Sequence, residues 1–195
     1  KTDEMGEVEW SRAWDLDPGE WDGAFDLLLT PDGHVVVAGI RSMINGPRRA
    51  ILIKVDLDGH EVWVKDYGEE NAGSEFWDIM EDADGGYVMA GGWFLTPIDR
   101  ATGEAVREGF IVKTGPDGEV LWQHRVSSSD YESTLLSSAV VLPGRGYIFV
   151  GAARPVGEDY WDMLWLKLTT GGQVIAFTSD REDGEGDIYT MDADG

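Results

Sequence analysis

One spaced motif recurs four times along this chain. Each copy is a lysine, a glycine five residues after it and a hydrophobic residue nine residues after it. The four copies are Lys1/Gly6/Trp10, Lys54/Gly59/Trp63, Lys113/Gly118/Trp122 and Lys167/Gly172/Ala176. Successive lysines are 53, 59 and 54 residues apart. A self-similar period of this length is typical of architectures that stack copies of one supersecondary unit. The fold therefore depends on the structure of a single unit.

Each unit predicts four short strands. Segments rich in β-branched and aromatic residues alternate with Asp-Gly and similar turns, which favour tight hairpins because glycine accepts a positive φ. The expected strands are 7–14, 24–30, 35–39, 50–55, 61–65, 76–82, 87–92, 109–114, 119–125, 135–142, 147–151, 163–168, 173–178 and 187–192. No segment shows a convincing helical period. The chain is therefore expected to be all-β.

Four antiparallel strands in about fifty residues are typical of one blade of a β-propeller. We expect complete blades at 22–66, 75–126 and 132–178, with parts of a fourth at 1–14 and 186–195. The middle two strands of that fourth blade are missing, so the propeller is incomplete within this chain. Exposed strand edges attract other strands. We therefore expect further strands, from the same polypeptide or from another copy, to cover 7–14 and 187–192.

The second unit carries a family resemblance. Residues 84–91 read Asp-Gly-Gly-Tyr-Val-Met-Ala-Gly, and 111–122 read Ile-Val-Lys-x-x-x-Asp-Gly-Glu-Val-Leu-Trp. This pattern resembles the secreted prokaryotic propeller repeats of surface proteins. It is more distantly similar to blades of pyrroloquinoline-quinone-type propellers, in which a Gly-Glu-x-x-Trp segment ends the outer strand. The resemblance implies a propeller fold over essentially the whole chain and an extracellular or cell-surface location. It implies no single function, because propellers host many activities. The third unit departs from the pattern at 144–146 and at Ala176.

The repeated residues have expected structural roles. Trp10, Trp63 and Trp122 are expected to cover the joints between successive blades. Gly39, Gly91 and Gly151 are expected to let neighbouring backbones crowd toward the propeller axis. Lys54, Lys113 and Lys167 are expected to lay their stems on apolar surface and carry their charges to an acidic rim. The alternative interpretation is a lysine that contacts a cofactor.

Composition narrows the classes of partner. The net charge is −23, from 15 basic and 38 acidic residues. Such a surface repels nucleic acid and anionic lipid, so neither is an expected partner. A high acid content with few lysines fits a salt-adapted surface, an ordinary acidic secreted protein or a cation-binding one.

The sequence contains no run of eighteen apolar residues, so no membrane span is predicted. Cysteine is absent, which excludes disulfides and thiolate metal sites. No signal peptide is visible, and Lys1 starts inside a repeat, so we expect the true N-terminus to lie elsewhere.

The blade-to-blade connectors and the loops between second and third strands should share one face, where long and varied loops usually carry function. The connectors carry acids at matching places, 53, 57 and 53 residues apart: Asp22, Glu75, Glu132 and Glu185. Other candidate ligand-binding residues are Arg48, Arg49, Arg100, Arg154, Trp21, Trp93 and Tyr160. These residues suit a divalent cation, or a protein or glycan ligand with charged groups. The alternative interpretation is a set of Arg–carboxylate pairs that only tie loops together.

Calcium is the metal that the acidic segments suit, because it takes six to eight oxygen ligands. The turns at 56–59 and 82–85 have alternating acids, but we interpret both as hairpin turns. The best candidate calcium ligands are Asp180, Glu182, Asp183, Glu185 and Asp187. The three histidines occupy unrelated places in the repeat, so no zinc site is predicted. No other cofactor is firmly implied.

No catalytic residues are predicted. The sequence favours a non-enzymatic binding, scaffolding or adhesion module. The alternative is a quinoprotein-type dehydrogenase, or another enzyme with its site in the central channel. Such a quinone site needs Glu, Asn and Asp ligands for calcium, and no inner strand of this chain carries an asparagine.

Overall fold

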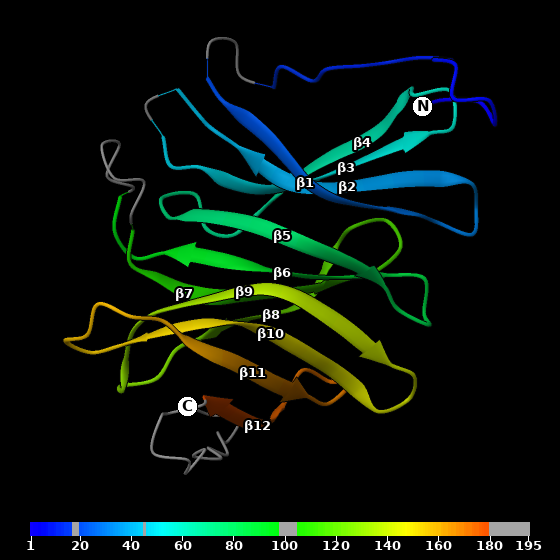
Figure 1. Ribbon diagram of the computed structural model, residues 1–195. Coiled ribbons are helices and arrows are strands. Elements are labelled where there is room, and N and C mark those ends of the chain that lie inside the picture. The colour runs from blue at the N-terminus through cyan, green and yellow to red at the C-terminus, as the bar shows by residue number, and fades with distance from the viewer. Residues whose placement is uncertain (17–19, 45, 98–104, 180–195) are drawn as a thin grey trace.

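The computed structural model describes residues 1–16, 20–44, 46–97 and 105–179, and these contain twelve strands and no helix. The strands are β1 (Asp22–Leu29), β2 (His34–Arg41), β3 (Arg49–Asp56), β4 (Glu61–Tyr67), β5 (Gly73–Glu81), β6 (Tyr87–Phe94), β7 (Arg107–Thr114), β8 (Val120–Val126), β9 (Tyr131–Leu142), β10 (Gly146–Pro155), β11 (Asp162–Leu168) and β12 (Val174–Ser179). They form three antiparallel meanders of four strands: β1–β4, β5–β8 and β9–β12. The three sheets are stacked one above another (Figure 1).

The all-β prediction is confirmed, and a strand is found at each of the twelve places expected between residues 24 and 178. The largest differences are at β9 and β10, because their pairing continues as far as Tyr131 opposite Pro155. No sheet closes on itself in the described part of the chain. The strand expected at 187–192 lies outside the described residues.

The strand expected at 7–14 is wrong. This segment has only one isolated bridge, between Thr2 and Val8, on a turn in which the N–H of Gly6 donates to the carbonyl of Asp3. Glu9 and Trp10 still hydrogen-bond to Lys1. A strand needs a neighbour for its backbone hydrogen bonds, and in the described part of the chain no strand pairs with residues 11–14. The chain instead crosses the outer side of the first sheet, where Trp14 packs against apolar side chains of β3.

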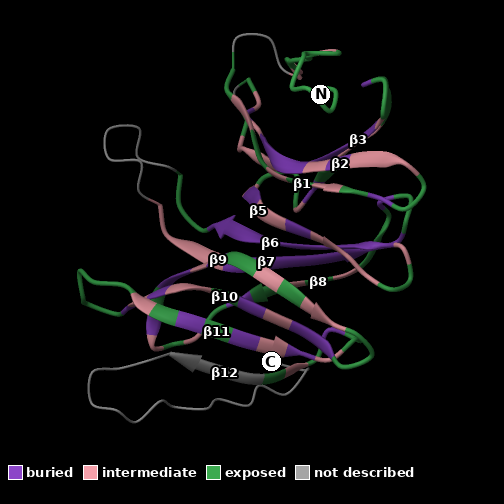
Figure 2. Ribbon diagram, turned by 45° about the vertical axis from the view of Figure 1, so that its right-hand side comes forward, coloured by how far each residue is buried: buried purple, intermediate pink, exposed green. Residues whose placement is uncertain are grey.

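Two apolar clusters fill the joints between the sheets. Leu52 of the first sheet packs against Phe76 and Met89 of the second. Ile111 of the second sheet packs against Phe149 of the third. The central strand β6 is buried along its whole length (Figure 2). At each joint the first strand of the next sheet lies across three strands of the sheet before it: β5 contacts β1, β2 and β3, and β9 contacts β5, β6 and β7.

The first strand of every sheet has a one-residue bulge opposite a glycine of the second strand. Gly39, Gly91 and Gly151 pair with Ala24, Phe76 and Leu136, and the register shifts beside each pair. A Cβ atom on Gly39 would lie 2.0 Å from the carbonyl oxygen of Gly23, within the same sheet. The same clash recurs at the other two glycines, at 1.9 and 1.8 Å. These glycines therefore accommodate a bulge. The closest approach is within each sheet, not between sheets as expected.

The repeated tryptophans lie at the joints. Trp63 of β4 and Trp122 of β8 each pack against the turn glycine of the next sheet, Gly118 and Gly172. Trp10 packs in the same way against Gly59, and its Nε1–H donates to the carbonyl of Leu57 at 2.9 Å. The N-terminal turn thus packs against the first sheet in the same way as the β3–β4 hairpin packs against the second sheet and the β7–β8 hairpin against the third.

The repeated lysines lie in the same joints. Lys54 Nζ is 3.1 Å from Asp32 Oδ2 and 3.3 Å from the hydroxyl of Tyr87, which belongs to the second sheet. Lys113 Nζ is 2.6 Å from Asp84 Oδ1. Both lysines are buried. At the rim of the joint, the charge of each lysine is paired with an acid from a turn of its own sheet.

Candidate functional site

A groove of about 1030 Å³ lies on the connector side of the stack, between the first and second sheets. It is formed by the β2–β3 loop, the β4–β5 connector and the β6–β7 loop. Because the sheets are antiparallel meanders, these segments all lie at the edge away from the tight Asp-Gly turns. The lining residues are Glu20, Trp21, Ser42, Met43, Gly46, Pro47, Arg48, Glu69, Asn71, Ala72, Gly73, Trp93, Phe94, Leu95, Thr96, Pro97, Arg107 and Arg125.

Three guanidinium groups in this groove each lie over an aromatic ring. The Arg48 guanidinium is 5.2 Å from the ring centroid of Trp21, and that of Arg125 is 5.2 Å from Trp93. The third, Arg107, is 5.0 Å from Phe94. Guanidinium groups at these distances are attracted by the ring quadrupole, which holds flat cations in fixed orientations. The groove therefore presents oriented cations in a protein whose net charge is strongly negative.

Two of these arginines have carboxylate partners. Arg107 Nε is 3.3 Å from Glu75 Oε1, in ion-pair range but not aligned as a hydrogen bond. Arg125 Nε is 3.1 Å from Glu108 Oε2. Burial raises the pKa of Glu75, and the opposing charges of Arg107 and Arg48 lower it only in part. Among the described residues, no carboxylate lies within ion-pair distance of Arg48.

The groove also contains uncharged polar side chains. Ser42 is buried, and its Oγ has no hydrogen-bond partner among the described residues. Asn71 and Thr96 line the groove with an amide and a hydroxyl. Trp21 is 52% exposed, so an indole surface is accessible beside these groups. This combination can bind an oxyanion, neighbouring hydroxyls and an apolar ring face at the same time.

Several predicted residues come together here. Trp21, Arg48 and Trp93 line the groove, and Glu75 lies beside Arg107. Arg49 instead donates to the carbonyls of Tyr67 and Gly68 and ties the end of β4 to β3.

Asp22 also has a structural partner. Its carboxylate accepts backbone N–H groups of Leu16 and Ser42. The evenly spaced acids do not occupy equivalent positions in the sheets, because Asp22 pairs with Arg41 whereas Glu75 pairs with Gly92.

The third sheet has a smaller set of the same kind. Arg154 lies 3.4 Å from Glu132 and over the ring of Trp161, at 5.7 Å from its centroid. Trp161 is 45% exposed, because the β10–β11 loop carries it to the surface. Tyr160 in that loop is exposed too. Arg100 and Glu185 lie outside the described residues.

Among the six residues that form the guanidinium–ring pairs, Arg107, Arg125 and Phe94 were not sequence candidates. One signal could have identified Arg107. It follows Arg48 by 59 residues, the same step that separates Lys54 from Lys113, so both arginines stand at the start of the third strand of their unit. Arg125 and Phe94 gave no such signal, since they belong to the groove only because two sheets face each other.

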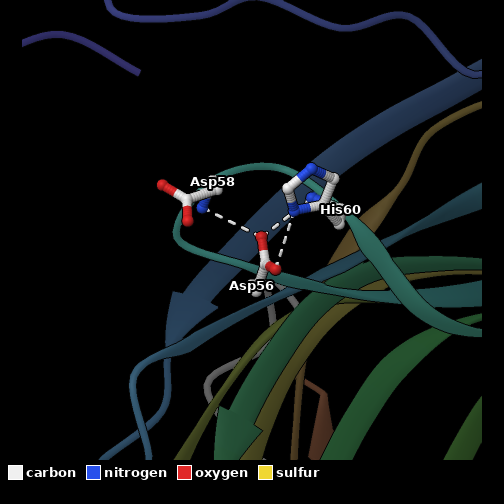
Figure 3. Close-up of side chains that lie close together, drawn as sticks. All are labelled: Asp56, Asp58 and His60. Atoms are coloured by element: carbon white, nitrogen blue, oxygen red, sulfur yellow. Dashed lines mark hydrogen bonds and ion pairs between the residues drawn. The ribbon is translucent and has the colours of Figure 1, made fainter.

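Among the residues that the structure describes, one group of metal-binding side-chain types lies close together: Asp56, Asp58 and His60 of the β3–β4 turn (Figure 3). Asp56 Oδ1 accepts the N–H groups of Asp58 and His60, at 2.9 and 2.8 Å, and Asp56 Oδ2 is 3.0 Å from His60 Nδ1. The hydrogen bond from the His60 N–H, more than any other contact, holds the pKa of Asp56 below its ordinary value. These contacts account for a hairpin turn, as expected. The candidate calcium segment 180–187 lies outside the described residues.

No protein-family model matches this chain, and no curated protein matches it. In the described ranges no helix is long and apolar enough to cross a membrane. Conclusions about function therefore depend on the groove and on the repeat itself.

Proposed function

We propose that this chain is part of a β-propeller of a secreted or cell-surface protein, in which it acts as a non-enzymatic binding module. Each four-stranded sheet is one blade. The proposal is supported by the equivalent joints: the same tryptophan–glycine contact and the same bulge recur from sheet to sheet. Propeller blades use this kind of repetition to build a rigid support for variable loops.

The binding site is the groove between the first and second sheets. The observation that carries this proposal is the set of three guanidinium groups, each held over a ring, in one groove. A role limited to tying loops together does not explain Arg48, because no carboxylate of the described residues lies within ion-pair distance of it. Arg48, Ser42 and Trp21 therefore form the part of the groove that contacts the ligand.

The ligand class that fits is a short saccharide with a carboxylate group. Arg48 offers two parallel N–H donors, which match a carboxylate. Ser42, Asn71 and Thr96 complement sugar hydroxyls, and the exposed indole of Trp21 complements the apolar face of a sugar ring. The net charge of −23 repels a long polyanion, so the ligand carries few charges.

Isothermal titration with trigalacturonic acid tests this proposal. We expect saturable binding that weakens with added salt, and no binding of the neutral sugar maltotriose. Arg48→Gln should weaken binding about tenfold or more, since a hydrogen bond to a charged group contributes roughly 1.5–3 kcal/mol. Arg145→Gln is the matched control: it removes one exposed arginine at the β9–β10 turn, on the opposite edge of the sheets.

Three results would overturn the proposal. The first is no binding of trigalacturonic acid, and the second is equally tight binding of it by Arg48→Gln and by the control variant. The third is tighter binding of a triglutamate peptide than of the sugar. The last result would assign the groove to acidic peptides.

A further inference from the structure

One cross-strand position recurs in every sheet, near the end of the second strand and the start of the third. It lies three residues after the bulge glycine of the second strand, opposite a residue at the start of the third. In the first two sheets this position belongs to the groove, whereas in the third sheet it lies outside the groove. The register gives three equivalent pairs: Ser42 with Arg48, Phe94 with Arg107 and Arg154 with Trp161.

The third-sheet pair exchanges the ring and the cation between the two strands. In the second sheet, Arg107 stands at the start of the third strand, and its guanidinium lies 5.0 Å from the ring centroid of Phe94. In the third sheet, Arg154 stands on the second strand, 5.7 Å from the centroid of Trp161. The exchange places the ring at the end of the β10–β11 loop, on the same side of the stack as the loops of the groove (Figure 1). The third sheet therefore presents a ring where the groove presents a cation.

Two neighbouring aromatic side chains of this loop are accessible. Tyr160 is 56% exposed and Trp161 is 45% exposed, whereas only 20% of the Arg154 side chain is exposed. Arg154 covers one face of the indole, so the remaining ring surface is available to a ligand. The quadrupole of an aromatic ring attracts a flat cation. The groove already uses this contact, since two of its guanidinium groups lie 5.2 Å from tryptophan centroids.

The charges around the two rings favour a cationic ligand. Glu132 Oε2 lies 3.4 Å from Arg154, and 46% of the Glu132 side chain is exposed. The N–H of Val156 donates to the carbonyl of Asp130 at 3.0 Å, which holds the β10–β11 loop beside the segment before β9. These two segments bring together five acids and one arginine: Asp130, Glu132, Glu158, Asp159, Asp162 and Arg154. An anionic ligand would meet repulsion from these carboxylates, and Arg154, unlike Arg48, has a carboxylate within ion-pair distance.

We propose that the β10–β11 loop is a second binding site, which takes an arginine side chain of a basic peptide. The peptide's guanidinium stacks on the exposed part of the Trp161 ring, and Glu132 accepts its N–H groups. The ring of Tyr160 packs against the apolar stem of the same side chain. This site takes a ligand of the opposite charge from that of the groove, and it does not depend on what the groove binds.

Nuclear magnetic resonance tests the proposal, because each of the nine tryptophans gives its own indole N–H signal. An acetylated and amidated triarginine peptide should shift the Trp161 signal saturably at about 0.15 M salt, where charges farther apart than about 8 Å are largely screened. Trigalacturonic acid should leave that signal unchanged. The signal is assigned by its loss in Trp161→Phe.

Two variants locate the contact by isothermal titration with the same peptide. Trp161→Ala and Glu132→Gln should each weaken binding about two- to fivefold, the size expected for an exposed cation–π contact or an exposed ion pair. Trp165→Ala is the matched control for the first variant, since Trp165 is a partly exposed tryptophan in the middle of β11. Glu61→Gln is the matched control for the second, since it removes an exposed acid of the first sheet.

A saturable shift of the Trp161 signal, with weaker binding by both site variants than by their controls, would support the site. An unchanged Trp161 signal would overturn it, as would equal affinities of Trp161→Ala and Trp165→Ala. Equal affinities of Glu132→Gln and Glu61→Gln would show that the peptide follows net charge alone, which also overturns the proposal. Tighter binding of the glucosamine trimer than of triarginine would overturn it by assigning the loop to amino sugars.

Discussion

At the scale of single residues, two carboxyl groups link neighbouring sheets. Asp26 and Asp78 lie in equivalent bulges, and each accepts a backbone N–H from the following sheet. The Asp26 side chain is also a neighbour of Asp78. Burial, and then the hydrogen bond with Asp26, raise the pKa of Asp78 above its ordinary value of 3.8. Asp78 therefore holds its proton more strongly in the folded protein than in the unfolded chain.

Asp78→Asn should remove a pH dependence of stability. Because the folded-state pKa is raised, the folded protein binds more protons than the unfolded one between pH 3.8 and that raised pKa. The stabilisation is fully present below pH 3.8 and is lost as the pH rises through the raised pKa. Asparagine keeps an acceptor for the Ala139 N–H and can donate to Asp26 at any pH. We expect the variant to be more stable than the wild type at pH 7, by about 1 kcal/mol or less, since Asp78 is only partly buried.

Thermal melts from pH 3 to pH 8 measure this effect. A gain of about 1 kcal/mol corresponds to roughly 2–4 °C in a chain of this size. Asp159→Asn, in the exposed β10–β11 loop, is the control that changes the same charge away from the joint. Parallel curves for Asp78→Asn and the wild type would contradict the prediction.

At the scale of elements, sequence and structure agree where the information is local. Asp-Gly turns and short β-rich runs predict all twelve strands, because a tight turn fixes the hairpin on either side of it. The strand at 7–14 fails because strand formation depends on a neighbour that the sequence does not specify. The bulges at Phe25, Trp77 and Ser137 are not predicted for the same reason: a bulge is a property of pairing between two strands.

In the candidate site too, the residues that local sequence identifies are predicted, and those that depend on how the sheets stack are missed. Trp21, Arg48 and Trp93 are predicted because they stand in long, varied loops. Arg125 is missed because it stands near the end of a regular strand, where nothing local distinguishes it. It enters the groove only through the way the sheets stack, which places it over Trp93.

Gly118→Ala should destabilise the protein more than Gly33→Ala. Both glycines have a positive φ, +76° and +79°, so each substitution carries a similar backbone cost of about 1–2 kcal/mol. A Cβ on Gly118 would lie 3.0 Å from the Tyr67 hydroxyl and 3.1 Å from the Trp63 ring, whereas one on Gly33 meets nothing within 4 Å. Overpacking adds about 1–3 kcal/mol at Gly118. Urea unfolding of both variants measures the difference, and equal midpoints would show that the tryptophan joint tolerates the extra methyl group.

At the scale of the whole molecule, charge opposes the folded state. The net charge of −23 is spread over three thin sheets, and the acids of the turns and connectors repel one another. Within the joints, the opposite arrangement holds: Lys54 and Lys113 are buried beside acids. Added salt therefore weakens mainly the repulsion between surface charges, because it screens buried ion pairs much less.

We expect the melting temperature to rise by several degrees as salt increases from 0.01 to 1 M, over which the Debye length falls from about 30 Å to about 3 Å. Sodium chloride and potassium chloride should act equally. Calcium and magnesium chloride, compared at equal ionic strength, should also act equally, because the described residues offer no set of six to eight oxygen ligands for calcium. A specific site would instead stabilise by mass action, at calcium concentrations too low to screen charge. A rise with calcium at millimolar concentration, absent with magnesium and abolished by a chelator, would contradict the screening account. It would then assign a calcium site to the acidic segment 180–187.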